Sequence, residues 1–112
     1  MIDNSKSYLR AILSGNLNSP KAFAYEAIIV DGTVKSLTIP SGSLYARMIF
    51  QSSIATPAAR YLQNKSVAVS TTVGLPLLDM TVFEVIDFAN LNGFQITQIS
   101  AATSVLHVEY FR

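Results

Sequence analysis

The side chains best suited to chemistry in this sequence are His107 and Glu109, which stand two residues apart near its end. On a β-strand, residues at this spacing point to the same face. An imidazole beside a carboxylate could act as a general base or as half of a metal site. His107 is the only histidine, however, and the sequence indicates neither a ligand set nor a nucleophile around it. We therefore interpret the pair as a surface or interface contact rather than as a catalytic centre.

Three acidic residues, Asp79, Glu84 and Asp87, form the other cluster of chemically capable side chains. A straight strand would send Glu84 and Asp87 to opposite faces, and Asp79 is typical of a turn. Their density is too low for a calcium loop, and no paired-acid hydrolytic site is indicated. The glycines stand singly and do not form a phosphate-binding pattern. We expect no catalytic residue, no bound metal and no cofactor, and hence a protein that is not an enzyme.

The composition is unusually poor in charge for a small domain. Only 13% of the residues are charged and 50% are hydrophobic, whereas about 25% charge is usual. The 8 basic and 7 acidic residues are scattered, so no specific nucleic-acid interface is expected. No apolar stretch approaches the roughly 18 residues of a membrane span, and the lack of cysteine excludes disulfides and thiolate sites. The low charge predicts a surface covered by other subunits, and so a homo-oligomer.

Residues 1–20 are predicted to form an arm or linker ahead of a domain that spans residues 21–112. Tyr8, Leu9 and Ile12 have the spacing of a short amphipathic helix, which Gly15 and Asn16 would end. A helix of about 10 residues is marginal alone in water, so it should dock on another surface. Two hypotheses remain open, namely that the arm docks on its own domain or reaches a neighbouring subunit.

From residue 22 onward the apolar period changes to two, which is typical of β-strands. Asp31-Gly32 predicts a hairpin in which residues 33–39 return antiparallel to the first strand. In the next strand Leu44, Ala46, Met48 and Phe50 are expected to form one apolar face. The face opposite them is amphipathic and consists of Tyr45, Arg47, Ile49 and Gln51. Shorter strands are expected at residues 58–63 and 81–88, weak β-propensity at residues 67–72, and an irregular connector at residues 73–77.

The end of the chain is predicted to be a closing hairpin. Asn92-Gly93 is a dipeptide that tolerates the positive φ of a tight turn. After it, Leu106, Val108 and Tyr110 alternate with polar residues, so the last strand should bury one face and pair inside the fold. About seven to eight strands at this spacing predict an all-β fold, an antiparallel β-sandwich or jelly-roll-like barrel.

From residue 36 onward the chain resembles a family of small bacteriophage virion proteins with β-sandwich folds. The features that carry the resemblance are, in order, residues 39–42 (IPSG), Ala46, residues 59–61 (ARY), residues 74–77 (GLPL), Asn90-Leu91 with Phe94, and residues 106–110 (LHVEY). The resemblance implies a structural component of the virion, such as a capsid decoration, vertex or head-completion protein, with capsid or other virion proteins as partners.

Two other functions are compatible with the residues, a small carbohydrate-binding or adhesin-like module and a subunit of a non-viral assembly. The first would need an exposed aromatic platform, for which tyrosines are the available residues because tryptophan is absent. For the assembly function, outward strand faces and the arm should supply the contacts. The expected interface residues are Tyr8, Leu9, Ile12, Tyr45, Arg47, Arg60, Tyr61, His107 and Glu109.

Overall fold

The computed structural model of the protein describes residues 21–112. These residues form seven strands in two antiparallel sheets and one short helix, α2 (Phe88–Gly93). This strand content confirms the prediction of an all-β fold for residues 21–112. A single cluster of buried side chains draws on both sheets. No helix of this part of the chain is long and apolar enough to cross a membrane. The predictions for residues 1–20, including Tyr8, Leu9 and Ile12, lie outside the described residues.

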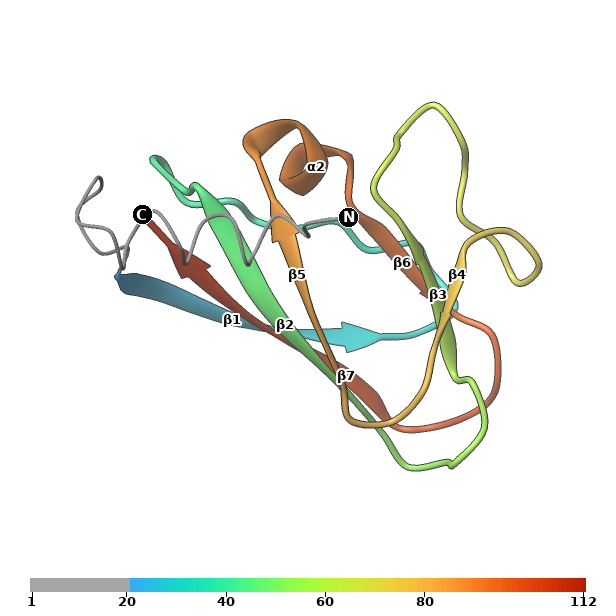
Figure 1. Ribbon diagram of the computed structural model, residues 1–112. Coiled ribbons are helices and arrows are strands. Elements are labelled where there is room, and N and C mark those ends of the chain that lie inside the picture. The colour runs from blue at the N-terminus through green and yellow to red at the C-terminus, as the bar shows by residue number, and fades with distance from the viewer. Residues whose placement is uncertain (1–20) are drawn as a thin grey trace, which may run out of the picture.

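The larger sheet has four strands, which lie side by side in Figure 1. Their order is β1 (Ala22–Val30), β7 (Ser104–Phe111), β2 (Tyr45–Ser52) and β5 (Thr81–Ile86). The predicted alternation of β2 is confirmed for Ala46, Met48 and Phe50, which are fully buried, while Arg47 and Gln51 are exposed. Leu44 lies before the strand and is 47% exposed, so its assignment to the buried apolar face is wrong. One face of this sheet therefore contributes to the core, and the other face points outward.

The smaller sheet has three strands, β4 (Leu75–Leu77), β3 (Ala59–Leu62) and β6 (Gln95–Gln98), in that order. Beyond β6, Lys35 exchanges backbone hydrogen bonds of 2.9 and 3.0 Å with Ile96. The hairpin predicted at Asp31-Gly32 is therefore wrong: residues 33–39 leave β1 and reach the edge of the other sheet. Asp31 starts this departure, since its carboxylate accepts hydrogen bonds from the backbone and hydroxyl of Thr33.

The last strand does pair inside the fold, as the sequence predicts. β7 lies between β1 and β2, and Leu106 and Val108 are fully buried. The ring of Tyr110 is 1% exposed, and its hydroxyl donates a hydrogen bond to the carboxylate of Glu26 on β1. Glu26 also accepts a hydrogen bond of 3.0 Å from the backbone N–H of Thr38. The carboxylate of Glu26 on β1 thus links β7 and the segment of residues 33–39, which crosses to the other sheet.

The closing hairpin at Asn92-Gly93 is wrong, because these residues end helix α2 and the strands on either side of residues 99–103 belong to different sheets. Gly93 does not have a positive φ. A Cβ atom there would lie 2.5 Å from the carbonyl oxygen of Gln63, so glycine permits a close approach of two backbones. The sharp change of direction comes earlier, at Asp87, whose φ is 83°.

The connection between β3 and β4 also differs from the prediction. Residues 67–72 form no strand, whereas part of the expected irregular connector is strand β4. Buried Gln95 holds this loop: its amide nitrogen donates to the carbonyls of Asn64 and Val67, and its Oε1 accepts from the N–H of Val69. The hydrogen bonds of the Gln95 side chain therefore satisfy backbone groups of this loop that a β-strand would have paired with a neighbouring strand.

Candidate functional site

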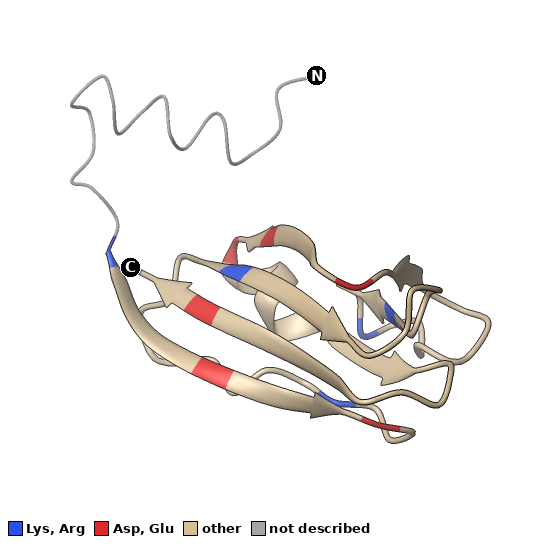
Figure 2. Ribbon diagram, turned by 90° about the horizontal axis from the view of Figure 1, so that it is seen from below, with Lys and Arg blue, Asp and Glu red and all other residues tan. Residues whose placement is uncertain are grey.

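The outward face of the four-stranded sheet is the surface best suited to a function. Its outward positions carry several exposed apolar side chains, among them Tyr25 (61% exposed), Ile29 (67%) and Val82 (58%). The face that an antiparallel sheet turns to water is usually polar. Figure 2 shows how few charged residues the strands of this sheet carry. The face is thus partly apolar over the width of the sheet.

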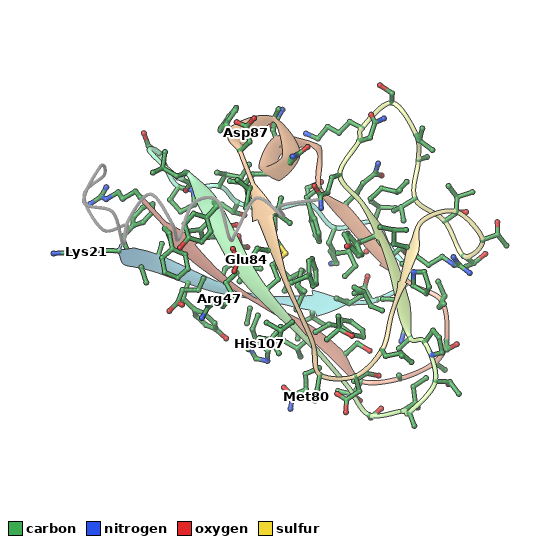
Figure 3. All side chains as sticks on the ribbon, viewed as in Figure 1. Lys21, Arg47, Met80, Glu84, Asp87 and His107 are labelled. Carbon is green, nitrogen blue, oxygen red and sulfur yellow. The ribbon has the colours of Figure 1, made fainter. Side chains whose placement is uncertain are left out.

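One row of residues across this face is charged. The strand registers place Tyr25 opposite Glu109, Glu109 opposite Arg47, and Arg47 opposite Glu84. Figure 3 shows Arg47, Glu84 and His107 near one another on this sheet. Within residues 21–112, neither carboxylate forms an ion pair with Arg47, and the ion pair found there joins Lys35 to Asp31. The row therefore presents one cation between two anions that form no ion pair with it within residues 21–112.

The next row is centred on His107, and both of its ring nitrogens have partners. Nδ1 lies 2.7 Å from the hydroxyl of Tyr25, and Nε2 lies 3.0 Å from Oε1 of Gln51. The amide oxygen of Gln51 can only accept a hydrogen bond, so Nε2 must be the donor in that contact. In the tautomer with its proton on Nε2, Nδ1 accepts a hydrogen bond from the hydroxyl of Tyr25. The rings of Tyr25 and His107 are also stacked, with centroids 6.1 Å apart. The imidazole thus positions Tyr25 and Gln51, and Glu109 is not its hydrogen-bond partner.

These two rows enclose a shallow cavity of about 170 Å³. It is lined by Tyr25, Arg47, Ile49, His107 and Glu109. Three residues expected at an interface, Arg47, His107 and Glu109, are therefore brought together by adjacent strands. Tyr25 and Ile49 were not among the expected interface residues, although their position on the outward side of their strands follows from the alternation.

Tyr45 lies on the same face, at the end of the sheet where the chain terminates. Its ring stacks on that of Phe111 with centroids 4.6 Å apart and an angle of 4° between the planes. Nearby, the guanidinium of Arg112 lies 4.3 Å from the centre of the Phe23 ring. This end of the sheet is therefore covered by aromatic rings.

Arg60 and Tyr61 lie on β3 in the other sheet, away from the residues above. Arg60 donates a hydrogen bond of 2.7 Å to the carbonyl of Gly74, and its buried Nε has no partner in the described part of the chain. The ring of Tyr61 stacks on Phe83 and Phe94 at 4.7 and 5.7 Å, and burial raises the pKa of its hydroxyl. Both side chains thus make structural contacts within the domain.

The acidic residues do not converge. Asp79 accepts a hydrogen bond of 2.8 Å from the backbone of Ser52 and so holds a turn, as expected. Within residues 21–112 no three histidine or carboxylate side chains are placed to hold a metal ion. The arrangement on the outward face can bind a surface through apolar contacts, hydrogen bonds and ion pairs.

Comparisons with protein-family models, with curated proteins and with solved structures each give no match for this chain.

Proposed function

We propose that this protein is a structural component of a bacteriophage virion that acts by assembling with other proteins and catalyses no reaction. Its place would be a capsid-associated one, as a decoration, vertex or head-completion protein. The observation that carries the assembly function is the outward face of the sheet β1-β7-β2-β5, which combines exposed apolar side chains with charges that lack ion-pair partners within residues 21–112.

The apolar part of this face supports burial against another protein. Tyr25, Ile29 and Val82 each expose more than half of their surface. Removing apolar surface from water contributes about 25 cal/mol per Å². Exposed apolar patches with polar groups around them mark interaction sites on soluble proteins. The low charge of the whole chain, 13% of its residues, is in keeping with a surface covered in this way.

The charged row gives the same face a means of selecting its partner. Arg47 stands between Glu84 and Glu109, and none of the three has an ion-pair partner in the described part of the chain. Charges across an interface mainly fix its register and exclude wrong partners. A shell protein with an acidic group facing Arg47 and basic groups facing the two glutamates would satisfy all three.

The assignment to a virion depends on the resemblance carried by residues 39–42, 59–61, 74–77 and 106–110. Two antiparallel sheets that share one core are compatible with the β-sandwich fold that this resemblance implies. On this proposal the protein resides in the virion, with capsid proteins and further copies of itself as partners.

Quantitative mass spectrometry of purified phage particles tests the proposal. We expect this chain in a fixed whole-number ratio to the major shell protein. The substitution Val82→Lys, on the outward face, should lower its incorporation about tenfold, equivalent to about 1.4 kcal/mol. Val67→Lys is the matched control, because Val67 is exposed but lies in the loop between β3 and β4. Particles without the chain would refute the virion role, and its recovery in a non-viral complex would favour the non-viral assembly.

A carbohydrate-binding module is the second candidate, and one observation favours it. The exposed ring of Tyr25 borders the cavity together with Arg47 and Glu109, whose side chains could hydrogen-bond sugar hydroxyls. Titration of the isotope-labelled protein with oligosaccharides would decide this: saturable shifts at these residues that Tyr25→Ala abolishes would support the module. Unchanged spectra at millimolar sugar would exclude it.

A further inference from the structure

The backbone hydrogen bonds of β7 reveal which groups of the edge strand β1 are unused. Lys21 and Arg112 exchange two backbone hydrogen bonds of 3.0 and 3.1 Å, while the carbonyl of Phe111 accepts from Leu44 beside β2. Because directions alternate along an antiparallel strand, even-numbered residues of β7 bond to β1 and odd-numbered ones bond to β2.

The register of β1 then identifies its open groups. Glu26 is opposite Val108 and Ile28 is opposite Leu106, so the even-numbered residues of β1 bond to β7. The N–H and C=O groups of Tyr25, Ala27 and Ile29 therefore point away from the sheet. No backbone hydrogen bond to these three residues occurs outside the β1-β7 ladder in residues 21–112. Figure 1 shows β1 as the outermost strand of its sheet.

Within residues 21–112 the other edges of the two sheets are short or partly bonded, whereas residues 25–29 of β1 are an open edge, since the register shift in β1 lies before them, between residues 22 and 24. β6 is bonded to Lys35 along its outer side, and β4 has three residues, one of which is Pro76. On the outer side of β5, the carbonyl of Ile86 accepts a hydrogen bond of 2.9 Å from the side chain of Asn90 on α2. β1 has nine residues without proline, and it has no charged residue on its outward face. Natural proteins rarely leave such an edge open, because it is a template for another strand.

We infer that β1 pairs antiparallel with β1 of a second copy of this chain, about a two-fold axis that passes through Ala27. The inference depends on the proposed assembly function in one respect, namely that copies of this chain are partners. The edge is self-complementary, since each open residue offers one donor and one acceptor, and an antiparallel two-fold pairing matches every donor with an acceptor.

The side chains select this register. With the axis at Ala27, two small residues meet at the centre and Tyr25 faces Ile29 of the second copy, a favourable aromatic and β-branched pair. Glu26 then lies opposite Ile28 of the other strand. An axis at Glu26 would instead place two carboxylates directly opposite each other, which is destabilising.

The Ala27 register uses all the open groups. The three open residues of each strand form hydrogen-bonded pairs that exchange two bonds each, about six in all. The two outward faces then lie on one continuous sheet, with an aromatic and aliphatic strip of Tyr25 and Ile29 side chains from both copies along the junction. The dimer would offer a third protein a surface twice as wide as that of one chain.

Proline at position 27 tests the pairing with little effect on the fold. The N–H of Ala27 makes no bond to β7, and proline is tolerated in an edge strand where its N–H would face solvent. We expect light scattering of the full chain to show Ala27→Pro with half the mass of the wild-type assembly and an unchanged far-ultraviolet spectrum. Ile29→Lys, which places a charge on the exposed edge, should have the same effect if proline disturbs folding. Val82→Lys, on the opposite edge strand, should leave the dimer intact.

Single cysteines test the register directly, because the chain contains no cysteine of its own. A short bis-maleimide should convert Ala27→Cys into a covalent dimer and leave Val82→Cys monomeric. Equal cross-linking of both cysteine variants would overturn the inference. So would Ala27→Pro and Ile29→Lys variants that both have the same mass as the wild type. These readouts are independent of the particle measurement. A β1 dimer absent from virions would refute the proposed virion role alone, and incorporation into virions without β1 pairing would refute this inference alone.

Discussion

Replacing Tyr110 by phenylalanine removes one hydroxyl from the centre of the fold. The ring lies on β7, is 1% exposed and packs within the shared core. Its hydroxyl donates to Glu26, the same carboxylate that accepts the N–H of Thr38. The ring would keep its packing in the variant, so the change isolates the hydrogen bond between the central strand and the edge strand.

The expected loss of stability follows from the kind of hydrogen bond that is removed. A hydrogen bond to a charged group contributes about 1.5–3 kcal/mol, so we expect the free energy of unfolding to fall by about 2 kcal/mol. For a domain of this size each kcal/mol corresponds to about 4–8 °C, which gives a decrease in Tm of about 8–16 °C. Tyr25→Phe is the matched control, because its hydroxyl bonds to His107 on the surface. Its effect should stay within about 0.5 kcal/mol.

Urea unfolding of the wild type, Tyr110→Phe, Glu26→Gln and the double variant measures the coupling between the two side chains. We expect the double variant to lose less stability than the two single variants do in sum. A Tyr110→Phe variant as stable as the Tyr25→Phe control, with additive effects of the two single substitutions, would refute the proposed bridge.

The same pair predicts a dependence on alkaline pH. Burial, reinforced by the hydrogen bond to Glu26 and by its charge, raises the pKa of Tyr110 far above its ordinary value of 10.0. The native state therefore retains a proton that the unfolded state releases. The stabilisation is complete below about pH 10 and decreases as the pH rises above it towards the native pKa. The gap in unfolding free energy between the wild type and Tyr110→Phe should narrow above pH 10. A gap that stays constant from pH 8 to pH 11 would contradict this assignment.

Two further substitutions test the local packing. Gly93→Ala should destabilise the protein by about 1–3 kcal/mol because its Cβ would meet the carbonyl oxygen of Gln63 at 2.5 Å, whereas Gly32→Ala, which has nothing within 4 Å, should have little effect in thermal unfolding. Gln95→Leu should cost about 1–3 kcal/mol, since it leaves the buried N–H of Val69 without its acceptor. Hydrogen exchange should then accelerate in residues 64–70 before the rest of the domain, and uniform protection there would argue against this role of Gln95.

The strands of the larger sheet could be predicted because their alternation is visible in the sequence. Ala46, Met48 and Phe50, and likewise Leu106, Val108 and Tyr110, occupy every second position and are buried as expected. The outward grouping of Arg47, His107 and Glu109 follows from the same alternation. That these residues share one cavity depends on the neighbour relation of β2 and β7, which are more than 50 residues apart along the chain.

The two hairpins were wrong because local turn preference was outweighed by long-range packing. Asp31-Gly32 does turn the chain, but Leu37 and Ile39 pack against the core and the segment between them and the turn pairs with β6. Gly93 is required by the backbone of Gln63, a residue 30 positions earlier, and no local pattern indicates this contact. The role of Gln95 was missed for the same reason, since its partners lie on a loop that no sequence period identifies.

The open edge of β1 was also beyond prediction from the sequence. The expected hairpin would have covered this edge with residues 33–39, so its availability becomes visible only once β7 is found as the neighbour of β1. Tyr25 and Ile29, exposed on either side of Ala27, then become residues of the proposed dimer contact. Alternation alone predicts only that they face outward.

Assembly of this chain with copies of itself is tested most directly by light scattering of the full 112-residue protein over a range of concentrations. We expect a mass that rises to an even multiple of 12.2 kDa with increasing concentration and that is halved by Ala27→Pro. A mass of 12.2 kDa at every concentration, for both proteins, would contradict assembly through this edge.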